Sequence, residues 1–248
     1  MRWKCHCAYD GTSFEGWQSQ LGGNTIQDIL ERRLNAIFQR SIRIHGSART
    51  DAGVHAKAQV FHFDAQWSHP PNELLRAFQS NLPKTVQVFR VQRVAETFHA
   101  RFSALGKRYV YQIFQGYAPP METRYFWSIR SARQLNIETM RAAAQQILGR
   151  HDFTAFAANP RDERNRGRNP IKHLKRLDIV QRGPRIRITS EADGYLYKMV
   201  RSLVGVLLEV GRGQIDPETI KELLAKNVRT KTVVTAPAQG LHLDRVFY

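Results

Sequence analysis

Residues 24–38 read NTIQDILERRLNAIF, and this stretch decides the fold of the first half of the chain. Its apolar side chains recur at the spacing of one helical face. They are Ile26, Ile29, Leu30, Leu34, Ile37 and Phe38. Asn24 is the expected N-cap, because Gln27 follows it three residues later. The stretch therefore predicts an amphipathic helix.

Strand patterns surround this helix. Residues 3–8 alternate before it, and two further strands are expected at 42–45 and 59–64. A second helix is expected to begin near Pro71 and to end before Pro83, since proline cannot continue a helix. A strand over 86–91 follows. Residues 1 to about 100 thus predict the order β-α-β-β-α-β.

The rest of the chain repeats this order. Expected elements are a strand over 107–114, a helix over 133–148, strands over 174–180 and 185–190, a helix over 197–210, an extra helix over 216–225 and a last strand over 241–246. We therefore predict an α+β fold of two ferredoxin-like halves, 1–104 and 105–248, around a largely antiparallel sheet with a central catalytic groove. A doubly wound parallel sheet would alternate single strands and helices instead.

Composition limits the classes of partner. The 248 residues include 38 Lys and Arg against 21 Asp and Glu, which gives a net charge of +17. The hydrophobic fraction of 42% excludes disorder and fibrous repeats. So large a positive charge favours a polyanion, and nucleic acid is preferred over an anionic membrane, a polyphosphate ligand or a merely solubilising charge.

Location and redox state follow from what the sequence lacks. It contains no apolar run of about 18 residues and no signal-peptide core, so we expect a cytoplasmic protein that does not cross a membrane. Cys5 and Cys7 are the two cysteines, and they have no second Cys or His pair at zinc-finger spacing. Reduced thiols in a strand are the preferred interpretation.

Residues 161–187 hold a basic segment. Ten Lys and Arg residues stand against three acids, a net charge of +7, and Arg164, Arg166 and Arg168 lie in its first part. We expect these three arginines to contact a phosphate backbone. The alternative is a solvated loop and strand edge.

Asp51 and Arg201 are the first candidate catalytic pair. Asp51 lies in the loop over 46–56, between two expected strands, where an Asp often serves only turn chemistry. Arg201 is the one charge in the apolar run over 199–208, which predicts a buried helix. A buried guanidinium needs an anion, so Arg201 is expected to pair with Asp51 if the halves meet; the alternative is that Arg201 braces its own half through another acid.

A strand over 107–111 supplies aromatic candidates. Tyr109 and Tyr111 share one face with Lys107, whereas Arg108 lies on the other. Core packing is one interpretation. The other is that Tyr109 stacks on a base while Lys107 holds phosphate.

The sequence lacks the motifs of several classes of enzyme. The histidines lack the spacing of a metal hydrolase, and no glycine-rich nucleotide motif opens a helix. We therefore expect an enzyme without cofactor or metal that depends on one aspartate.

Several motifs bear a family resemblance, in the family's order along the chain. They are YDGT (9–12), GWQ (16–18), RTDAGVHA (49–56), FHARFSA (98–104), HDF (151–153), MVR (199–201) and APA (236–238). Together they resemble the TruA-type tRNA pseudouridine synthases. The resemblance implies an isomerase without cofactor that converts uridine to pseudouridine at positions thirty-eight, thirty-nine and forty of the tRNA anticodon stem-loop. It also implies a homodimer that binds tRNA across both subunits.

The resemblance assigns roles residue by residue. It implies that Asp51 is the essential aspartate, Tyr109 the active-site tyrosine and Arg201 the partner of the aspartate. Arg49 is implied to help displace the target base. Whether Asp51 attacks the sugar or removes the ribose 2′ proton stays open, and an RNA-binding protein without catalysis is the main alternative function.

Two positions depart from the family pattern. Ala48 stands where a glycine commonly precedes the RTDAGVHA motif, and residues 170–172 read PIK where the family often has TVR. Lys172 keeps the positive charge but loses the two-pronged phosphate grip of arginine.

Overall fold

The computed structural model describes residues 1–130, 135–158 and 169–248. The chain forms two compact units: a first unit of Met1–Leu105 with His242–Tyr248, and a second unit of Gly106–Leu241. A division at residue 104 would leave the C-terminal strand with the second half, whereas these last seven residues cluster with the first unit. The predicted phosphate contacts Arg164, Arg166 and Arg168 lie outside the described residues.

The first unit is built on an antiparallel sheet. Its strands are β1 (Arg2–Tyr9), β2 (His45–Gly46), β3 (His55–Asp64) and β4 (Val86–Val94). β1 lies between β3 and β4, and the short β2 pairs with the outer side of β3. This is the 4-1-3-2 order of a ferredoxin-like unit. β10 (Leu241–Phe247) pairs in parallel with β3 through His242 and Leu243.

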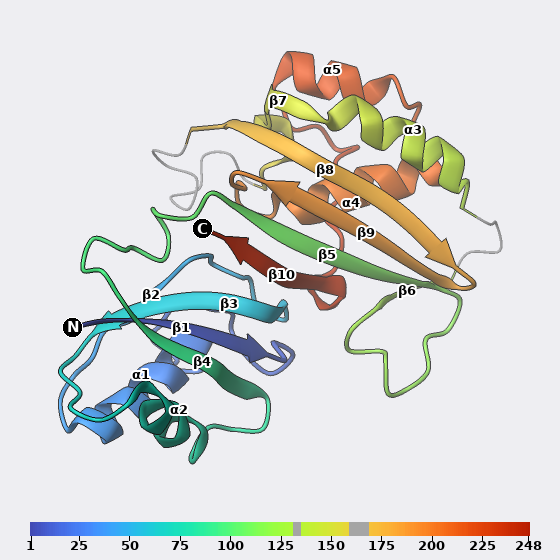
Figure 1. Ribbon diagram of the computed structural model, residues 1–248. Coiled ribbons are helices and arrows are strands. Elements are labelled where there is room, and N and C mark those ends of the chain that lie inside the picture. Colours follow the sequence, from blue (N-terminus) through green and yellow to red (C-terminus); the bar gives the residue numbers. More distant parts are fainter. Residues whose placement is uncertain (131–134, 159–168) are drawn as a thin grey trace. The chain divides into compact units, whose positions relative to one another are not determined.

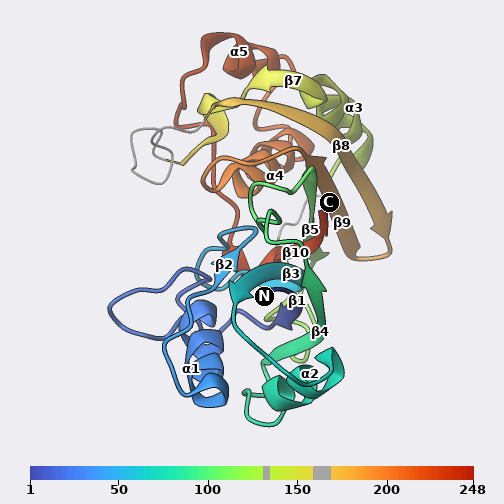
Figure 2. The ribbon, with the colours of Figure 1, turned by 60° about the vertical axis from the view of Figure 1, so that its left-hand side comes forward.

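Two helices cover one face of this sheet, as Figures 1 and 2 show. They are α1 (Ile26–Phe38) and α2 (Pro71–Gln79). The apolar face of α1 is buried through Ile26, Leu30 and Leu34, as its periodicity predicts. The predicted cap is wrong by one residue: Thr25 accepts from the backbone N–H of Asp28.

β1 fills the core beneath these helices. Every second residue is buried, so that Cys5 and Cys7 are enclosed free thiols and burial raises the pKa of both. This agrees with the expectation of reduced strand thiols.

The second unit has its own sheet in the order β5-β9-β8-β7. The strands are β5 (Gly106–Gln115), β7 (Gly149–Asp152), β8 (Ile171–Arg182) and β9 (Arg185–Ala192), all antiparallel to their neighbours, while β6 (Trp127–Ile129) runs parallel to β5. α3 (Ile137–Ile147) packs on β8 and on α4 (Met199–Gly211), and α5 (Thr219–Lys226) follows (Figure 1). The α+β fold class is confirmed.

Several boundaries differ from the sequence prediction. The strand expected over 42–45 is reduced to β2, α2 ends at Gln79 rather than near Leu82, and α3 starts at Ile137 under an Asn136 cap. β6 and β7 were not predicted, because a three-residue strand and the sequence GRHD show no apolar alternation. Among the described residues, no helix combines the length and apolar character that crossing a membrane requires.

Candidate active site

Asp51 lies in the loop of residues 47–54 that connects β2 to β3 in the first unit, and this loop is called the Asp51 loop below. Its first residues are fastened to β3: the N–H of Ser47 donates to the Val60 carbonyl at 2.7 Å, and its hydroxyl donates to Gln59 Oε1 at 2.7 Å. Gln59 also donates to the Ala48 carbonyl at 2.7 Å. The Gln59 side chain is fully buried, so it fixes the start of the loop from inside the core.

The middle of the Asp51 loop is held by the segment that follows β1. Thr50 shares a buried hydrogen bond with the Tyr9 hydroxyl at 2.8 Å, and its carbonyl accepts from the N–H of Trp17 at 3.0 Å. On the other side, the Asp51 carbonyl accepts from Val54 at 3.1 Å and closes a turn. The backbone of the half-buried Asp51 is therefore fixed before and after it.

Gly16 explains why the motif around Trp17 needs a glycine. It has a φ of +93°, and a Cβ there would lie 2.6 Å from the Thr50 carbonyl oxygen and 3.0 Å from the Asp51 carbonyl carbon. Only a residue without a side chain allows the two backbones to approach this closely. Gly16 is thus a condition for the position of Asp51, although sequence reasoning gave it no role.

Arg49 is exposed on the same loop, two residues before Asp51. Partial burial, together with the neighbouring charge of Arg101, lowers the pKa of Arg49. The positive charge of Arg101 therefore acts on Arg49 beside the Asp51 loop. Sequence reasoning predicted Arg49 as a substrate contact but gave Arg101 no such role.

The rings of three histidines, His45 on β2, His62 on β3 and His99 after β4, lie together in the first unit. The rings of His45 and His62 stack with centroids 4.9 Å apart, and the ring of His99 lies 4.6 Å from that of His62. His62 Nδ1 accepts from the N–H of Ala100 at 3.1 Å. No group of three or more His, Cys, Asp or Glu side chains in the described parts of the chain is arranged to hold a metal ion.

Tyr109 is buried on β5 in the second unit. Its ring meets that of Tyr195 edge-on, with centroids 5.1 Å apart. The Tyr195 hydroxyl lies 2.9 Å from that of Ser190, which is the residue opposite Tyr109 in the sheet, and burial raises the pKa of Tyr195 well above its usual value. Tyr109 is therefore held on a rigid strand against a second, protonated tyrosine.

The neighbours of Tyr109 on β5 lie as the alternation predicts. Lys107 is half-buried, and its carbonyl accepts from the Tyr195 hydroxyl at 3.4 Å. Arg108 lies on the opposite face and pairs with Glu191 at 2.8 Å. The charge of Arg108 is thus used within the sheet, whereas Lys107 shares the face of Tyr109.

Arg201 lies in the first turn of α4 and is half-buried. Its Nε donates to the Ala236 carbonyl at 2.7 Å, and its own carbonyl accepts from the Ala236 N–H at 3.0 Å. The Tyr111 hydroxyl donates to the Pro237 carbonyl at 2.7 Å. Burial raises the pKa of Tyr111, partly opposed by the positive charge of Arg201. Ala236 and Pro237 belong to the APA motif, so this motif is the sequence signal for these contacts.

Each unit thus brings together part of the predicted site. The first unit holds Arg49 and Asp51 on one loop, and the second holds Tyr109 on β5 and Arg201 on α4. The pairing of Asp51 with Arg201 involves both units and stays a prediction. A fixed carboxylate beside exposed cations is suited to act on a polyanionic substrate.

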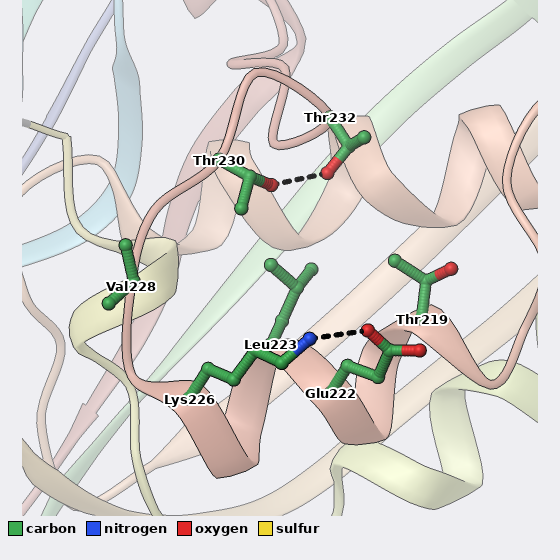
Figure 3. A pocket seen from close by; sticks show the side chains of 7 residues that line it. All are labelled: Thr219, Glu222, Leu223, Lys226, Val228, Thr230 and Thr232. Atoms are coloured by element: carbon green, nitrogen blue, oxygen red, sulfur yellow. Dashed lines mark hydrogen bonds and ion pairs between the residues drawn. The ribbon is translucent and has the colours of Figure 1, made fainter.

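A cavity of about 640 Å³ lies apart from these residues, beside α5 in the second unit (Figure 3). Its lining residues are Thr219, Glu222, Leu223, Lys226, Val228, Thr230 and Thr232. Lys226 and Glu222 form an ion pair at 2.9 Å across one wall. None of the predicted site residues lines this cavity.

Comparison with known proteins identifies the family. The chain matches the family model described as tRNA pseudouridine synthase over residues 7–103 and 143–248. It is 41% identical over 243 residues to tRNA pseudouridine synthase A 2 of Clostridium perfringens, covering 97% of this chain and 96% of the relative. It is 38% identical over 252 residues to tRNA pseudouridine synthase A of Anaplasma phagocytophilum, covering 100% of both chains.

A third relative agrees: tRNA pseudouridine synthase A of Nitrobacter hamburgensis is 40% identical over 249 residues, with 100% of this chain and 99% of the relative covered. Fold, site and matches together define the class of protein, an isomerase that acts on tRNA. The chain belongs to the tRNA pseudouridine synthase family. The resemblance found in its motifs is confirmed.

Proposed function

We propose that this protein isomerises uridine to pseudouridine at positions thirty-eight, thirty-nine and forty of the tRNA anticodon stem-loop. Asp51 is the catalytic carboxylate, Arg201 is its cationic partner and Tyr109 contacts the target base. The first unit supplies the Asp51 loop, and residues 105–248 supply Tyr109 and Arg201. The observation that supports this most directly is the fixation of Asp51 through Thr50, which is bonded to both Tyr9 and Trp17.

The reaction needs no outside donor of atoms or electrons. The bond from ribose C1′ to uracil N1 breaks, the base turns, and C1′ joins C5. The C5 proton leaves and N1 gains a proton, so substrate and product are isomers. Asp51 either attacks C1′ or removes the 2′ proton, and both routes start from the charged carboxylate, which an adjacent guanidinium stabilises.

The target base must leave its stack before Asp51 can reach the ribose. Unstacking the base costs a few kcal/mol of free energy, and stacking on the Tyr109 ring offsets about 1–3 kcal/mol of that cost. Arg49, exposed two residues before Asp51, enters the space that the base vacates. Tyr109 also helps to remove the C5 proton in the last step.

The remaining partners follow from charge and family. The net charge of +17 suits tRNA, and the basic segment with Arg164, Arg166, Arg168 and the half-buried Lys107 are the proposed phosphate contacts. The protein works as a homodimer in the cytoplasm, with one tRNA across both subunits. It needs neither metal nor organic cofactor.

Tritium release from tRNA labelled at uridine C5 tests this function under single-turnover conditions. Asp51→Asn removes the charge at nearly constant shape, and we expect no detectable release while tRNA binding is largely kept. Asp64→Asn is the matched control, because Asp64 pairs with Arg2 on the surface of the same unit at 2.7 Å, and it should release tritium like the wild type. Turnover by Asp51→Asn would contradict the assigned role. Binding without release by the wild type would favour an RNA-binding protein without catalysis.

A further inference from the structure

The FHARFSA motif forms a turn whose function is not explained by the proposed chemistry. His99 and Ser103 close it: the Ser103 N–H donates to the His99 carbonyl, and the His99 N–H donates to the Ser103 hydroxyl, both at 2.9 Å. Inside the turn, His99 Nδ1 accepts from the N–H groups of Arg101 at 3.1 Å and Phe102 at 3.3 Å. Four hydrogen bonds within five residues make this turn a rigid support.

Hydrogen bonds hold the turn of residues 99–103 next to the Asp51 loop. The Ala100 N–H donates to His62 on β3 at 3.1 Å, and the Ala100 carbonyl accepts from the Tyr248 hydroxyl at 2.7 Å. The His99 ring lies 5.7 Å from that of His45, which is two residues before Ser47. The strands that fix the start of the Asp51 loop therefore also fix this turn.

Phe102 is the residue that the turn presents to solvent. Its side chain is 75% exposed, which forgoes the stabilisation that burial of a phenylalanine provides. One neighbour of its ring is the His99 ring, with centroids 4.4 Å apart, and the Arg101 guanidinium lies 5.4 Å from the Phe102 centroid. Such a combination of a flat apolar ring and an adjacent cation is typical of single-stranded nucleic acid sites.

The cations near Phe102 are suited to bind an anion. Arg101 lies near Arg49, and their mutual repulsion is one cause that lowers the pKa of Arg49. A phosphate between two guanidinium groups removes that repulsion and offers each of them charge-assisted hydrogen bonds. The net charge of +17 makes a nucleic acid, rather than an apolar protein surface, the occupant that fits this site.

We propose that Phe102 is a stacking residue for a base of the tRNA next to the target uridine, and that Arg101 and Arg49 bind the adjoining phosphate. This inference rests on the proposed function, because it assigns the bound RNA a path over the turn 99–103. Phe102 is a positioning residue: it holds the RNA strand while Asp51 acts on its neighbour.

The test is a set of variants at Phe102, assayed for tRNA affinity at several salt concentrations. Phe102→Leu keeps an apolar side chain but removes the ring, and we expect its Kd to rise about 5- to 150-fold, as for the loss of one stacked base. Phe102→Tyr restores the ring and should return the Kd to within about twofold of the wild type. The salt dependence of binding should not change in either variant, because no charge is lost.

Arg101→Gln tests the proposed phosphate contact separately from base stacking on Phe102. We expect it to lower the slope of log Kd against log salt by about one. Tyr117→Leu is the matched control, because Tyr117 in the second unit is 74% exposed and also has an arginine near its ring, Arg130 at 4.5 Å. It should bind tRNA like the wild type.

Three results would overturn the inference. They are an unchanged Kd for Phe102→Leu, an equal loss in Tyr117→Leu, and a shift in the oligomeric state of tRNA-free Phe102→Leu, which would assign the ring to a subunit interface. Thermal unfolding of each variant confirms that the exposed substitution leaves the fold intact. Tritium release by the wild type tests the proposed function separately, so failure of the stack and failure of the reaction give different results.

Discussion

The hydroxyl oxygens of Tyr9 and Thr50 lie 2.8 Å apart, in a buried hydrogen bond between residues 41 positions apart in the chain. Tyr9 is the last residue of β1, and Thr50 immediately precedes Asp51. The hydrogen bond thus ties the end of the central strand of the first unit to the loop of its candidate catalytic residue.

Tyr9→Phe should lower both stability and turnover. It removes one partner of a buried pair, which costs about 1–3 kcal/mol in the free energy of unfolding, and it loosens the residue before Asp51. Urea unfolding and single-turnover tritium release measure the two effects, and tRNA binding should be kept. Thr50→Val is the control: the double variant should lose clearly less than the sum of the single losses, and strict additivity would refute the coupling.

Gly16→Ala should displace the Asp51 loop. Its Cβ would meet the Thr50 carbonyl oxygen at 2.6 Å, in addition to the cost of a positive φ. Gly183→Ala is the matched control, because Gly183 has a φ of +55° and no described atom lies within 4 Å of its Cβ position. We expect Gly16→Ala to lose about 1–3 kcal/mol more stability than the control, together with most turnover. Equal losses in the two variants would show that close packing at Gly16 is unimportant.

Stability should fall as the pH falls from about 6.5 toward 4. Burial, with the neighbouring charges of His99, His45 and Arg2, lowers the pKa of His62 from 6.5 to about 4. Because the unfolded chain then binds a proton that the folded chain does not, stability present at pH 7 is lost in this window. Because His62 is partly screened by solvent, we expect the free energy of unfolding to fall by about 1–2 kcal/mol between pH 7 and pH 5.

His62→Gln tests this pH dependence, since glutamine keeps an acceptor for the Ala100 N–H. Urea unfolding at both pH values should show a smaller loss in the variant than in the wild type. Some loss remains in the variant because it retains other groups that titrate there, such as His6, whose pKa burial also lowers to about 4. The same loss in both proteins would contradict the prediction.

Arg201→Lys should reduce turnover at least about tenfold while keeping the net charge. A single ammonium cannot both donate to the Ala236 carbonyl, as Arg201 Nε does at 2.7 Å, and pair with a carboxylate through two donors. Arg212→Lys, at the other end of α4 and paired with Glu209 at 2.7 Å, is the control and should be active. Wild-type turnover by Arg201→Lys would argue against its pairing with Asp51.

Glutamine at Arg164, Arg166 and Arg168 together should weaken tRNA binding and lower its salt dependence by up to about one unit of slope for each lost phosphate contact. The control changes Arg141, Lys221 and Lys226 to glutamine, three cations of the second unit that each have an acidic partner on their own helix. That control loses the same charge but should keep the slope. An unchanged slope in the first variant would mean that these three arginines do not contact phosphate.

Much of the fold was predictable because its signals are local. The helical periodicity of residues 26–38 and the alternation in β1 each depend on neighbours within a few positions, and both are confirmed. The bounds of an element were less predictable where contacts with residues distant in the sequence determine them. β2 does not begin at residue 42 because the backbone N–H groups of Ile42 and Ile44 donate to the side chains of Asn35 and Glu31 on α1, and no pattern near residue 42 reports this.

For the candidate site, the sequence by itself determined which residue types stand where: an aspartate between Thr50 and Ala52, a tyrosine on a strand, and an arginine in an apolar helix. These follow from residue order and from the motifs, which also identified the family. Only the tertiary structure decided which hydrogen bonds hold these residues in place. Tyr9 bonds to Thr50, the Ala236 carbonyl accepts from Arg201, and His62 accepts from the turn that carries Phe102. The physical reason is that a hydrogen bond of about 3 Å between residues 35 to 41 positions apart depends on the packing of whole strands and helices, which no short stretch of sequence specifies.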